Sequence, residues 1–346
     1  MTRAAGNTLY FVVPDGVDDP RRTSGGNVFD QRVRDGLRTI GWDVRMAQVD
    51  ADAPSPADGV LADLPSGALV LIDGLIAGRS PEAIEAAADR LRIVALTHMV
   101  SAAFPGADAR VVEGEQRALR SARRVIATSE WTRSELARRH VVPPEQVVVA
   151  HPGSDDAPAA SGTPAGSALL CVGVVAPHKG QDILIEALAA LGSDAAWTCT
   201  IAGPLDVCPD YAHDVETRAA AAGLGDRVTM TGVLGEDELD SAYQHADLVV
   251  APSRVESYGM AIADALRRGI PVIASRVGGI PLTVESRAAV LVPPGEPLPL
   301  ADALREWMRD ADLRARLKRA ARAGRAGLPH WSDTAEQIAS TLAGVR

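Results

Sequence analysis

A lysine and a glycine, Lys179 and Gly180, lie in a loop of a type that can bind phosphate. The loop follows a predicted strand, Ala168–Val172, and opens a predicted helix, Gln181–Leu191. Free backbone N–H groups and the helix dipole favour an anion at such a helix start, and the ammonium group of Lys179 adds a positive charge. The pattern therefore suits a diphosphate, although an ordinary surface lysine has the same local sequence.

A glycine pair, Gly25 and Gly26, lies between the first predicted strand, Leu9–Val13, and the first predicted helix, Val28–Ile40. Glycine lets backbone N–H groups approach a phosphate closely at a helix start. The complete GxGxxG fingerprint of dinucleotide-binding domains is absent. The pair is thus a candidate phosphate contact, and a flexible loop remains the alternative.

Two acidic residues, Glu256 and Asp264, lie eight positions apart on either side of Gly259. We expect Glu256 in the loop after the strand Leu248–Ala251 and Asp264 one turn into the helix Met260–Arg268. Both carboxylates could then face one cleft, where each accepts several hydrogen bonds from the hydroxyl pairs of a sugar and a ribose. Acidic residues also stabilise the start of a helix, but that role does not explain the whole Glu-Ser-Tyr-Gly arrangement.

Alternating strands and helices must position the residues of the first half. The β-rich runs that predict strands are Leu9–Val13, Leu69–Ile72, Ile93–Thr97, Val125–Thr128 and Val147–Ala150. The helical patterns between them are Val28–Ile40, Pro81–Arg90, Glu113–Ala122 and Glu130–Arg139. This alternation predicts βαβ units and a mostly parallel sheet.

The same alternation restarts after residues 154–167, a stretch with almost no large apolar side chain that we interpret as an interdomain linker. The predicted strands are Ala168–Val172, Thr198–Ala202, Val228–Thr231, Leu248–Ala251 and Pro271–Ala274. The predicted helices are Gln181–Leu191, Ala212–Ala222, Met260–Arg268, a helical Arg-rich tail over Ala301–Gly324, and Asp333–Leu342.

These patterns predict an α/β chain with two Rossmann-like doubly wound domains. The first spans residues 1–153, the second spans 168–328, and residues 329–346 form a C-terminal helix that packs back on the first domain. Open α/β sheets bind ligands beyond the carboxyl ends of their strands. We therefore expect the two domains to face a central cleft that holds the ligands.

Length and composition agree with this organisation. The chain has 346 residues, of which 47% are hydrophobic and 23% charged, which fits two ordinary globular domains. Its formal charge of −10 argues against nucleic-acid binding. Three cysteines without a CxxC pair, no apolar run of roughly 20 residues and no signal-peptide pattern predict a cytoplasmic protein. Of the 35 basic residues only Lys179 and Lys318 are lysine.

The motifs, taken in order, resemble one family. Residues 253–259 read Ser-Arg-Val-Glu-Ser-Tyr-Gly, and Asp264 and the glycine pair Gly278-Gly279 follow. This arrangement is similar to retaining glycosyltransferases of the GT-B fold, family 4, whose signature is Glu-x7-Glu. The resemblance runs from about residue 9 to 332, and its further pieces are Ser24–Gly26, His98, Ala127–Ser129, His151–Asp155, Lys179-Gly180, Ile201–Gly203, Asp226–Val228, Thr231–Val233 and Val292–Gly295.

The resemblance implies a transfer of sugar from a nucleotide diphosphate sugar, with UDP or GDP as the expected carrier, to a small-molecule or lipid-linked acceptor. It implies retention of anomeric configuration and neither metal nor cofactor. Lys179 would contact the leaving diphosphate, Glu256 the donor-sugar hydroxyls, and His98 the transferred sugar and the acceptor. The other implied donor-binding residues are Gly25, Gly26, His178, Gly203, Val233, Leu234, Ser257, Tyr258, Gly259, Met260 and Asp264.

Two departures from the family pattern keep other functions open. Val174 stands where the family usually has an arginine, five residues before Lys179, and His178 is a possible substitute. Asp264 replaces the second glutamate with a side chain one methylene shorter. A non-catalytic nucleotide-sugar-binding subunit is therefore an alternative. A nucleotide-sugar epimerase or a phosphorylase is another, although such enzymes would be expected to carry further acid/base residues or a cofactor lysine.

Two remaining features have plainer interpretations. Residues 309–325 carry seven basic side chains, which favour a solvated helix face over an anionic membrane contact in a chain of net charge −10. Asp50 and Asp52 form a DxD pair in a loop rich in proline and aspartate, and not after a central strand, so we do not interpret it as a metal site.

Overall fold

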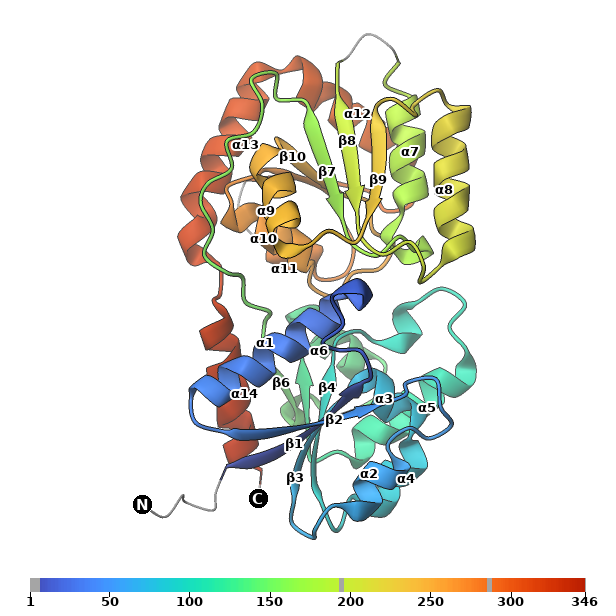
Figure 1. Ribbon diagram of the computed structural model, residues 1–346, viewed down its shortest axis with the longest axis vertical. Coiled ribbons are helices and arrows are strands. Elements are labelled where there is room, and N and C mark those ends of the chain that lie inside the picture. Colours follow the sequence, from blue (N-terminus) through green and yellow to red (C-terminus); the bar gives the residue numbers. More distant parts are fainter. Residues whose placement is uncertain (1–6, 193–195, 285–287, 346) are drawn as a thin grey trace. The chain divides into compact units, whose positions relative to one another are not determined.

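The computed structural model describes residues 7–192, 196–284 and 288–345, so part of the segment considered above for a signal peptide, residues 1–6, lies outside it. The chain divides into two compact units (Figure 1). Unit 1 holds the residues up to Arg22, Gly26–Gly153 and the residues from Pro329 onward. Unit 2 holds Thr23–Gly25 and Ser154–Leu328.

Unit 1 is built on a sheet of six parallel strands in the order β2-β1-β3-β4-β5-β6. The strands are β1 (Thr8–Pro14), β2 (Asp43–Val49), β3 (Leu69–Asp73), β4 (Arg92–Thr97), β5 (Arg124–Ala127) and β6 (Val147–Val149). Five of them lie where apolar runs predicted strands. The sequence pattern does not predict β2, an edge strand whose side chains are mostly exposed or half-buried.

Helices cover both faces of this sheet. They are α1 (Gly25–Thr39), α2 (Asp58–Asp63), α3 (Gly74–Arg79), α4 (Pro81–Ala87), α5 (Ala109–Ser121), α6 (Glu130–Arg138) and α14 (Trp331–Ala343). Alternate strand residues point into two separate apolar cores, as the period of a strand requires. Helix α1 begins at Gly25, three residues before the predicted start, so the glycine pair forms its first turn.

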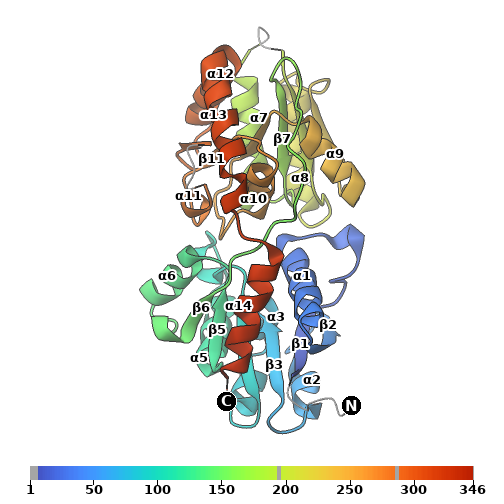
Figure 2. The same cartoon turned by 90° about the vertical axis from the view of Figure 1, so that its left-hand side faces the viewer.

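Helix α14 completes the core on the α1 side of unit 1, and Figure 2 shows the two helices next to each other. The ring centroids of Phe29 and Trp331 are 5.8 Å apart. A Cβ atom on Gly36 would lie 2.6 Å from that of Ala335. Ile338 and Leu342 are fully buried in the same core as β1.

Unit 2 has a second sheet of six parallel strands in the order β12-β11-β10-β7-β8-β9. They are β7 (Ala168–Val172), β8 (Thr198–Ala202), β9 (Val228–Gly232), β10 (Leu248–Ala251), β11 (Val272–Ser275) and β12 (Ala289–Val292). The order reverses between β7 and β10, which are neighbours in the sheet. Open α/β sheets bind ligands at such a reversal.

The helices of unit 2 also form two layers. They are α7 (Gln181–Ala189), α8 (Pro209–Ala221), α9 (Glu236–His245), α10 (Met260–Arg267), α11 (Ile280–Thr283), α12 (Pro297–Arg309) and α13 (Ala311–Gly324). One apolar core packs the sheet against α7, α8 and α12, and it contains the buried Trp307 of α12. The other core packs the sheet against α9 and α10. None of the described helices is both long and apolar enough to cross a membrane.

Two segments of unit 2 differ from the sequence prediction: the Arg-rich tail, which was predicted as one helical stretch, and residues 154–167, which were predicted as a linker. The predicted helical tail is broken at Asp310, whose carboxylate accepts hydrogen bonds from the N–H groups of Asp312 and Leu313 and so starts α13. The segment 154–167 belongs to unit 2. The backbone N–H of Thr163 in this segment donates a hydrogen bond to the buried carboxylate of Asp247, which also accepts one from Lys318.

Candidate active site

The centre of the candidate site in unit 2 is an ion pair between Lys179 and Glu256. Lys179 ends the 3₁₀ turn Pro177–Lys179 after β7, and Glu256 lies in the loop after β10. Because these two strands are neighbours where the order reverses, residues 77 positions apart meet. Lys179 Nζ lies 2.6 Å from Glu256 Oε2, and the two side chains are 23% and 12% exposed.

Backbone hydrogen bonds hold Glu256 in place from two directions. The carbonyl of His178 accepts hydrogen bonds from the N–H groups of Arg254, at 2.7 Å, and Val255, at 3.2 Å. The carbonyl of Glu256 accepts one from the N–H of Gly279 at 3.0 Å. The loop after β10 is therefore fixed to the Lys179 turn on one side and to the loop after β11 on the other.

In the chain without ligand, His178 does not carry the positive charge that an arginine at position 174 would carry. Burial lowers the pKa of His178 to about 4, the ammonium of Lys179 acts in the same direction, and Glu256 opposes them only weakly. The imidazole is therefore neutral at pH 7. Lys179 is the cation that directly contacts Glu256.

The other predicted donor residues of unit 2 occupy the ends of strands and the start of α10. Gly203 follows β8, and a Cβ atom there would lie 2.0 Å from the carbonyl oxygen of Gly173. Val233 and Leu234 follow β9 and are half-buried. Gly259 adopts φ +93° as the residue before α10, and Met260 is the first residue of that helix.

Three residues next to Glu256 differ in what they can offer. Ser257 and Tyr258 are each 7% exposed, so a ligand would meet mainly their backbone. Burial raises the pKa of Tyr258 to about 12, and the charge of Asp264 contributes, so the phenol is neutral. Asp264 lies in the second turn of α10 and is half-buried.

The remaining predicted residues lie at the start of α1 and after β4; Gly26 and His98 belong to unit 1, whereas Gly25 belongs to unit 2. Gly25 and Gly26 are the first two residues of α1. His98 follows β4, and its Nε2 lies 3.1 Å from Asp30 Oδ1 and 3.1 Å from Asp73 Oδ2. Its ring also packs edge-on against Phe29 at 5.2 Å.

The two carboxylates change the protonation of His98. Burial alone would lower its pKa, but Asp30 and then Asp73 outweigh this effect and raise the pKa to about 10. Burial raises the pKa of Asp30, while His98 opposes the shift. At neutral pH the imidazole is therefore a cation, in contact with the carboxyl groups of Asp30 and Asp73.

Sequence reasoning proposed His98 but missed both of its acidic partners. Asp30 is in phase with Val33 and Leu37 on the buried face of α1, and this i, i+3, i+7 pattern was the available signal. Asp73 is the last residue of the fully buried strand β3. Among the described residues, Asp30, Asp73 and His98 are the one group of three whose ligand atoms lie close enough together to hold a metal ion, within 4.8 Å.

The DxD pair lies at a turn after β2. The backbone N–H of Asp52 donates to Asp50 Oδ1 at 2.9 Å. The Asp52 side chain is 88% exposed and pairs with Arg79. This arrangement is a local turn with a surface ion pair.

Two doubly wound parallel sheets in one chain define the GT-B fold of glycosyltransferases. Sucrose-phosphate synthase from Thermosynechococcus elongatus matches with a TM-score of 0.81 at 20% identity, over 97% of this chain and 98% of that one. Anabaena Alr3699/HepE, solved in complex with UDP and glucose, matches with a TM-score of 0.74 at 19% identity, over 97% and 99% of the two chains. These likenesses establish the fold.

Family matches fall in both units. Residues 160–324 match the family described as Glycosyl transferases group 1, and residues 75–157 match Glycosyltransferase Family 4. The chain belongs to this group 1, family 4 class of glycosyltransferases.

Curated relatives carry one recurring name. The D-inositol 3-phosphate glycosyltransferase of Streptomyces scabiei is 31% identical over 63% of this chain and 53% of its own length. The protein of the same name from Salinispora tropica is 32% identical over 63% of this chain and 50% of its own. The chain thus spans about half the length of these relatives.

Proposed function

We propose that this chain transfers a sugar from a nucleotide diphosphate sugar to a hydroxyl acceptor, with retention of anomeric configuration and without a metal ion. The observation that carries the proposal is the Lys179–Glu256 pair at the strand-order reversal of unit 2. One residue can neutralise a diphosphate and the other can accept hydrogen bonds from sugar hydroxyls.

In the proposed reaction the bond between the anomeric carbon and the diphosphate oxygen breaks, and the acceptor oxygen forms the new bond. The hydroxyl proton leaves with the nucleoside diphosphate. Negative charge develops on the leaving group, and Lys179 would stabilise it together with helix N-termini. A donor already in place for developing charge is usually a large catalytic contribution.

The remaining predicted residues have supporting roles in this proposal. Asp264 would bind the ribose hydroxyls, Val233 and Leu234 would line the base, and the backbone around Gly259 would bind the sugar. In unit 1, His98 would contact the transferred sugar, and Gly26 would allow the backbone to approach the diphosphate.

The similar proteins suggest which nucleotide donors and which acceptors to test first. UDP or GDP is the proposed carrier, and the UDP complexes of HepE favour testing UDP first. The relatives named for D-inositol 3-phosphate favour a phosphorylated polyol in the acceptor panel, beside simple sugars and lipid-linked acceptors.

The first experiment is a thermal-shift screen of UDP-, GDP- and ADP-sugars. A ligand at about 100 times its Kd stabilises a protein by about 2.7 kcal/mol. The donor that binds is then incubated with the acceptor panel, with and without EDTA, while release of nucleoside diphosphate is measured. We expect turnover that EDTA does not reduce, and no response to any nucleotide would contradict the proposal.

The same experiment separates the alternative functions. A binding subunit would give a thermal shift without release of nucleoside diphosphate, either by transfer or by slow donor hydrolysis. An epimerase would change the sugar while it stays attached to the nucleotide, which NMR of the recovered donor detects.

A further inference from the structure

Lys179 and Glu256 lie in two loops outside the sheet, so something must hold these loops in register. Two backbone hydrogen bonds connect them at the His178 carbonyl, as described above. The loops also approach each other closely at Gly180, where φ is +73° and a Cβ atom would lie 2.3 Å from the carbonyl oxygen of Pro252. A larger residue at position 180 would push the two loops apart.

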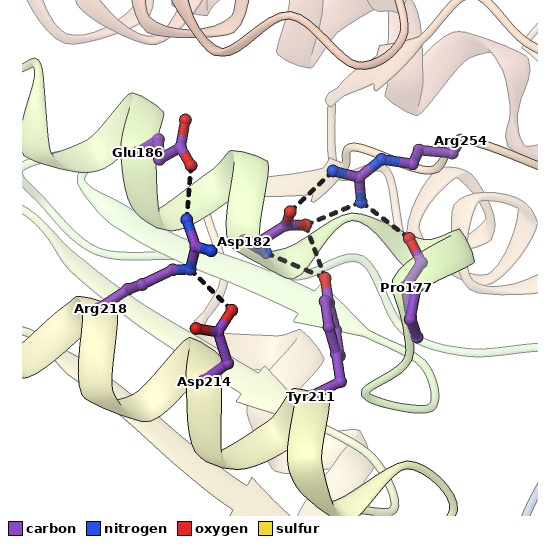
Figure 3. Close-up of polar contacts among 7 residues, drawn as sticks. All are labelled: Pro177, Asp182, Glu186, Tyr211, Asp214, Arg218 and Arg254. Atoms are coloured by element: carbon purple, nitrogen blue, oxygen red, sulfur yellow. Dashed lines mark hydrogen bonds and ion pairs between the residues drawn. The ribbon is translucent and has the colours of Figure 1, made fainter.

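A side-chain network adjoins this contact and is centred on Arg254 (Figure 3). Its Nη1 donates to the carbonyl of Pro177 at 2.8 Å and to Asp182 Oδ1 at 2.8 Å. Its Nη2 donates to Asp182 Oδ2 at 2.7 Å. The guanidinium therefore connects the loop of Glu256 to the residues that flank Lys179, two positions before it and three after it.

Tyr211 of α8 supports the same carboxylate. Its hydroxyl donates to Asp182 Oδ1 at 2.6 Å and accepts a hydrogen bond from the Asp182 N–H at 3.1 Å. Burial would raise the pKa of Asp182, but Arg254 and Tyr211 outweigh it and the pKa is lowered. Asp182 is thus held as an anion with its partners fixed on both oxygens.

We propose that Arg254 is a positioning residue of the donor site, which sets the placement of Lys179 against Glu256 through its two-point contact with Asp182. This inference rests on the proposed function. A planar guanidinium suits the two-point contact, and lysine cannot reproduce it. Because both terminal nitrogens of Arg254 bind Asp182, we do not assign Arg254 as a replacement for the arginine missing at Val174.

The test compares Arg254→Lys, Asp182→Asn and Tyr211→Phe with a matched control, Arg218→Lys. Arg218 also links α8 to α7, through Glu186, and pairs with Asp214 of its own helix (Figure 3). Its side chain is 46% exposed, and these two ion-pair partners lie in neither loop. The measurements are kcat and KM for the donor, melting temperature, and the rate at which an amine-reactive acetylating reagent modifies Lys179, followed by mass spectrometry. Lys318 is the internal reference for that rate.

We expect Arg254→Lys and Asp182→Asn to lower kcat by about 10- to 10²-fold, because a displacement of about 1 Å at a reacting site can cost that much. Tyr211→Phe should have a smaller effect in the same direction. The three variants should acetylate Lys179 several-fold faster with Lys318 unchanged, and Arg218→Lys should match the wild type throughout. A double variant at Arg254 and Asp182 should be no worse than either single one.

Other results would overturn the inference. If Asp182→Asn retained wild-type kcat while Arg254→Lys lost it, Arg254 would act on the ligand directly. Wild-type kinetics and acetylation in all three variants, or faster acetylation at both lysines in all three, would exclude a positioning role. If the wild type itself showed no turnover, the proposed function would fail, and the acetylation rates would still decide whether Arg254 positions Lys179.

Discussion

Lys179 Nζ lies 2.6 Å from Glu256 Oε2, so in the chain without ligand the two proposed donor-binding groups bind each other. Both side chains are mostly buried, and such a contact is stronger than a pair on the surface. A diphosphate that binds Lys179 must compete with Glu256 for it. Binding of a donor sugar by Glu256 would lower that competition, which couples recognition of the two parts of the donor.

Replacement of Lys179 tests its role in catalysis. Lys179→Ala should slow transfer by about 10²–10³-fold, because one donor to a developing negative charge is worth roughly 2.7–4 kcal/mol. Lys179→Arg should also be impaired, since a wide fork replaces a compact charge. The matched control is Lys318→Arg, which keeps a charge beside Asp247. Steady-state turnover decides, and near-normal turnover of Lys179→Ala would reject the assignment.

The scarcity of lysine allows the ligand contact to be observed without a turnover assay. The two lysine side chains, Lys179 and Lys318, are 23% and 30% exposed. UDP or GDP, whichever binds, should slow acetylation of Lys179 several-fold and leave Lys318 unchanged. Equal protection of both lysines, or none at saturating nucleotide, would contradict a diphosphate contact at Lys179.

Glu256→Gln should separate binding of the nucleotide from use of the sugar. The variant removes the internal competitor for Lys179, so isothermal titration should show several-fold tighter binding of the nucleoside diphosphate alone. Turnover of the complete donor should fall, because an amide replaces the carboxylate that accepts from the sugar hydroxyls. Glu186→Gln is the control, since Glu186 pairs with Arg218 on an exposed surface. Weaker binding of the free nucleoside diphosphate would argue against the competition.

The protonated His98 predicts a loss of stability in alkali. Its pKa is about 10 in the folded chain and 6.5 ordinarily, so the folded state retains the proton over that range while the unfolded state loses it. The stabilisation is complete below pH 6.5 and disappears as the pH rises toward 10. Melting temperatures of the wild type and His98→Gln between pH 6 and 10 should converge. A constant difference across the range would mean that His98 is neutral.

Replacement of Asp30 tests the contribution of a carboxylate that pairs with His98. Asp30 is 1% exposed, and Asp30→Ala leaves the imidazolium with Asp73 alone. Removal of one partner of a buried pair typically costs about 3–5 kcal/mol, which denaturant unfolding measures. Asp35→Ala, at an exposed position of the same helix α1, is the control. Equal unfolding free energies for the two variants would show that the pair at Asp30 contributes little.

Much of the scaffold follows from the sequence because buried parallel strands are short apolar runs. β7, β8 and β10 have the predicted bounds. Two strands were missed, β2 and β12, and both lie at the edge of a sheet. β2 alternates without a continuous apolar run, which is typical of an edge strand. The start of α1 was missed because two glycines favour helix weakly.

The sequence likewise predicts only part of the candidate site. Lys179 and Glu256 could each be proposed from their loops, since the types of residue near a helix start indicate the chemistry. Their contact could not, because it depends on β7 and β10 being neighbours in the sheet. The sequence does not indicate the role of Arg254. Its partner Asp182 on α7, and Tyr211 on α8 that supports Asp182, come close to it only in the folded chain.

The return of α14 to unit 1 has a consequence for biosynthesis. The core that contains β1 also contains Ile338 and Leu342, so its last pieces are translated after all of unit 2. Segments emerge from the ribosome in chain order. The unit whose translation begins first is therefore completed last, and its apolar surface stays exposed in the nascent chain until α14 has emerged.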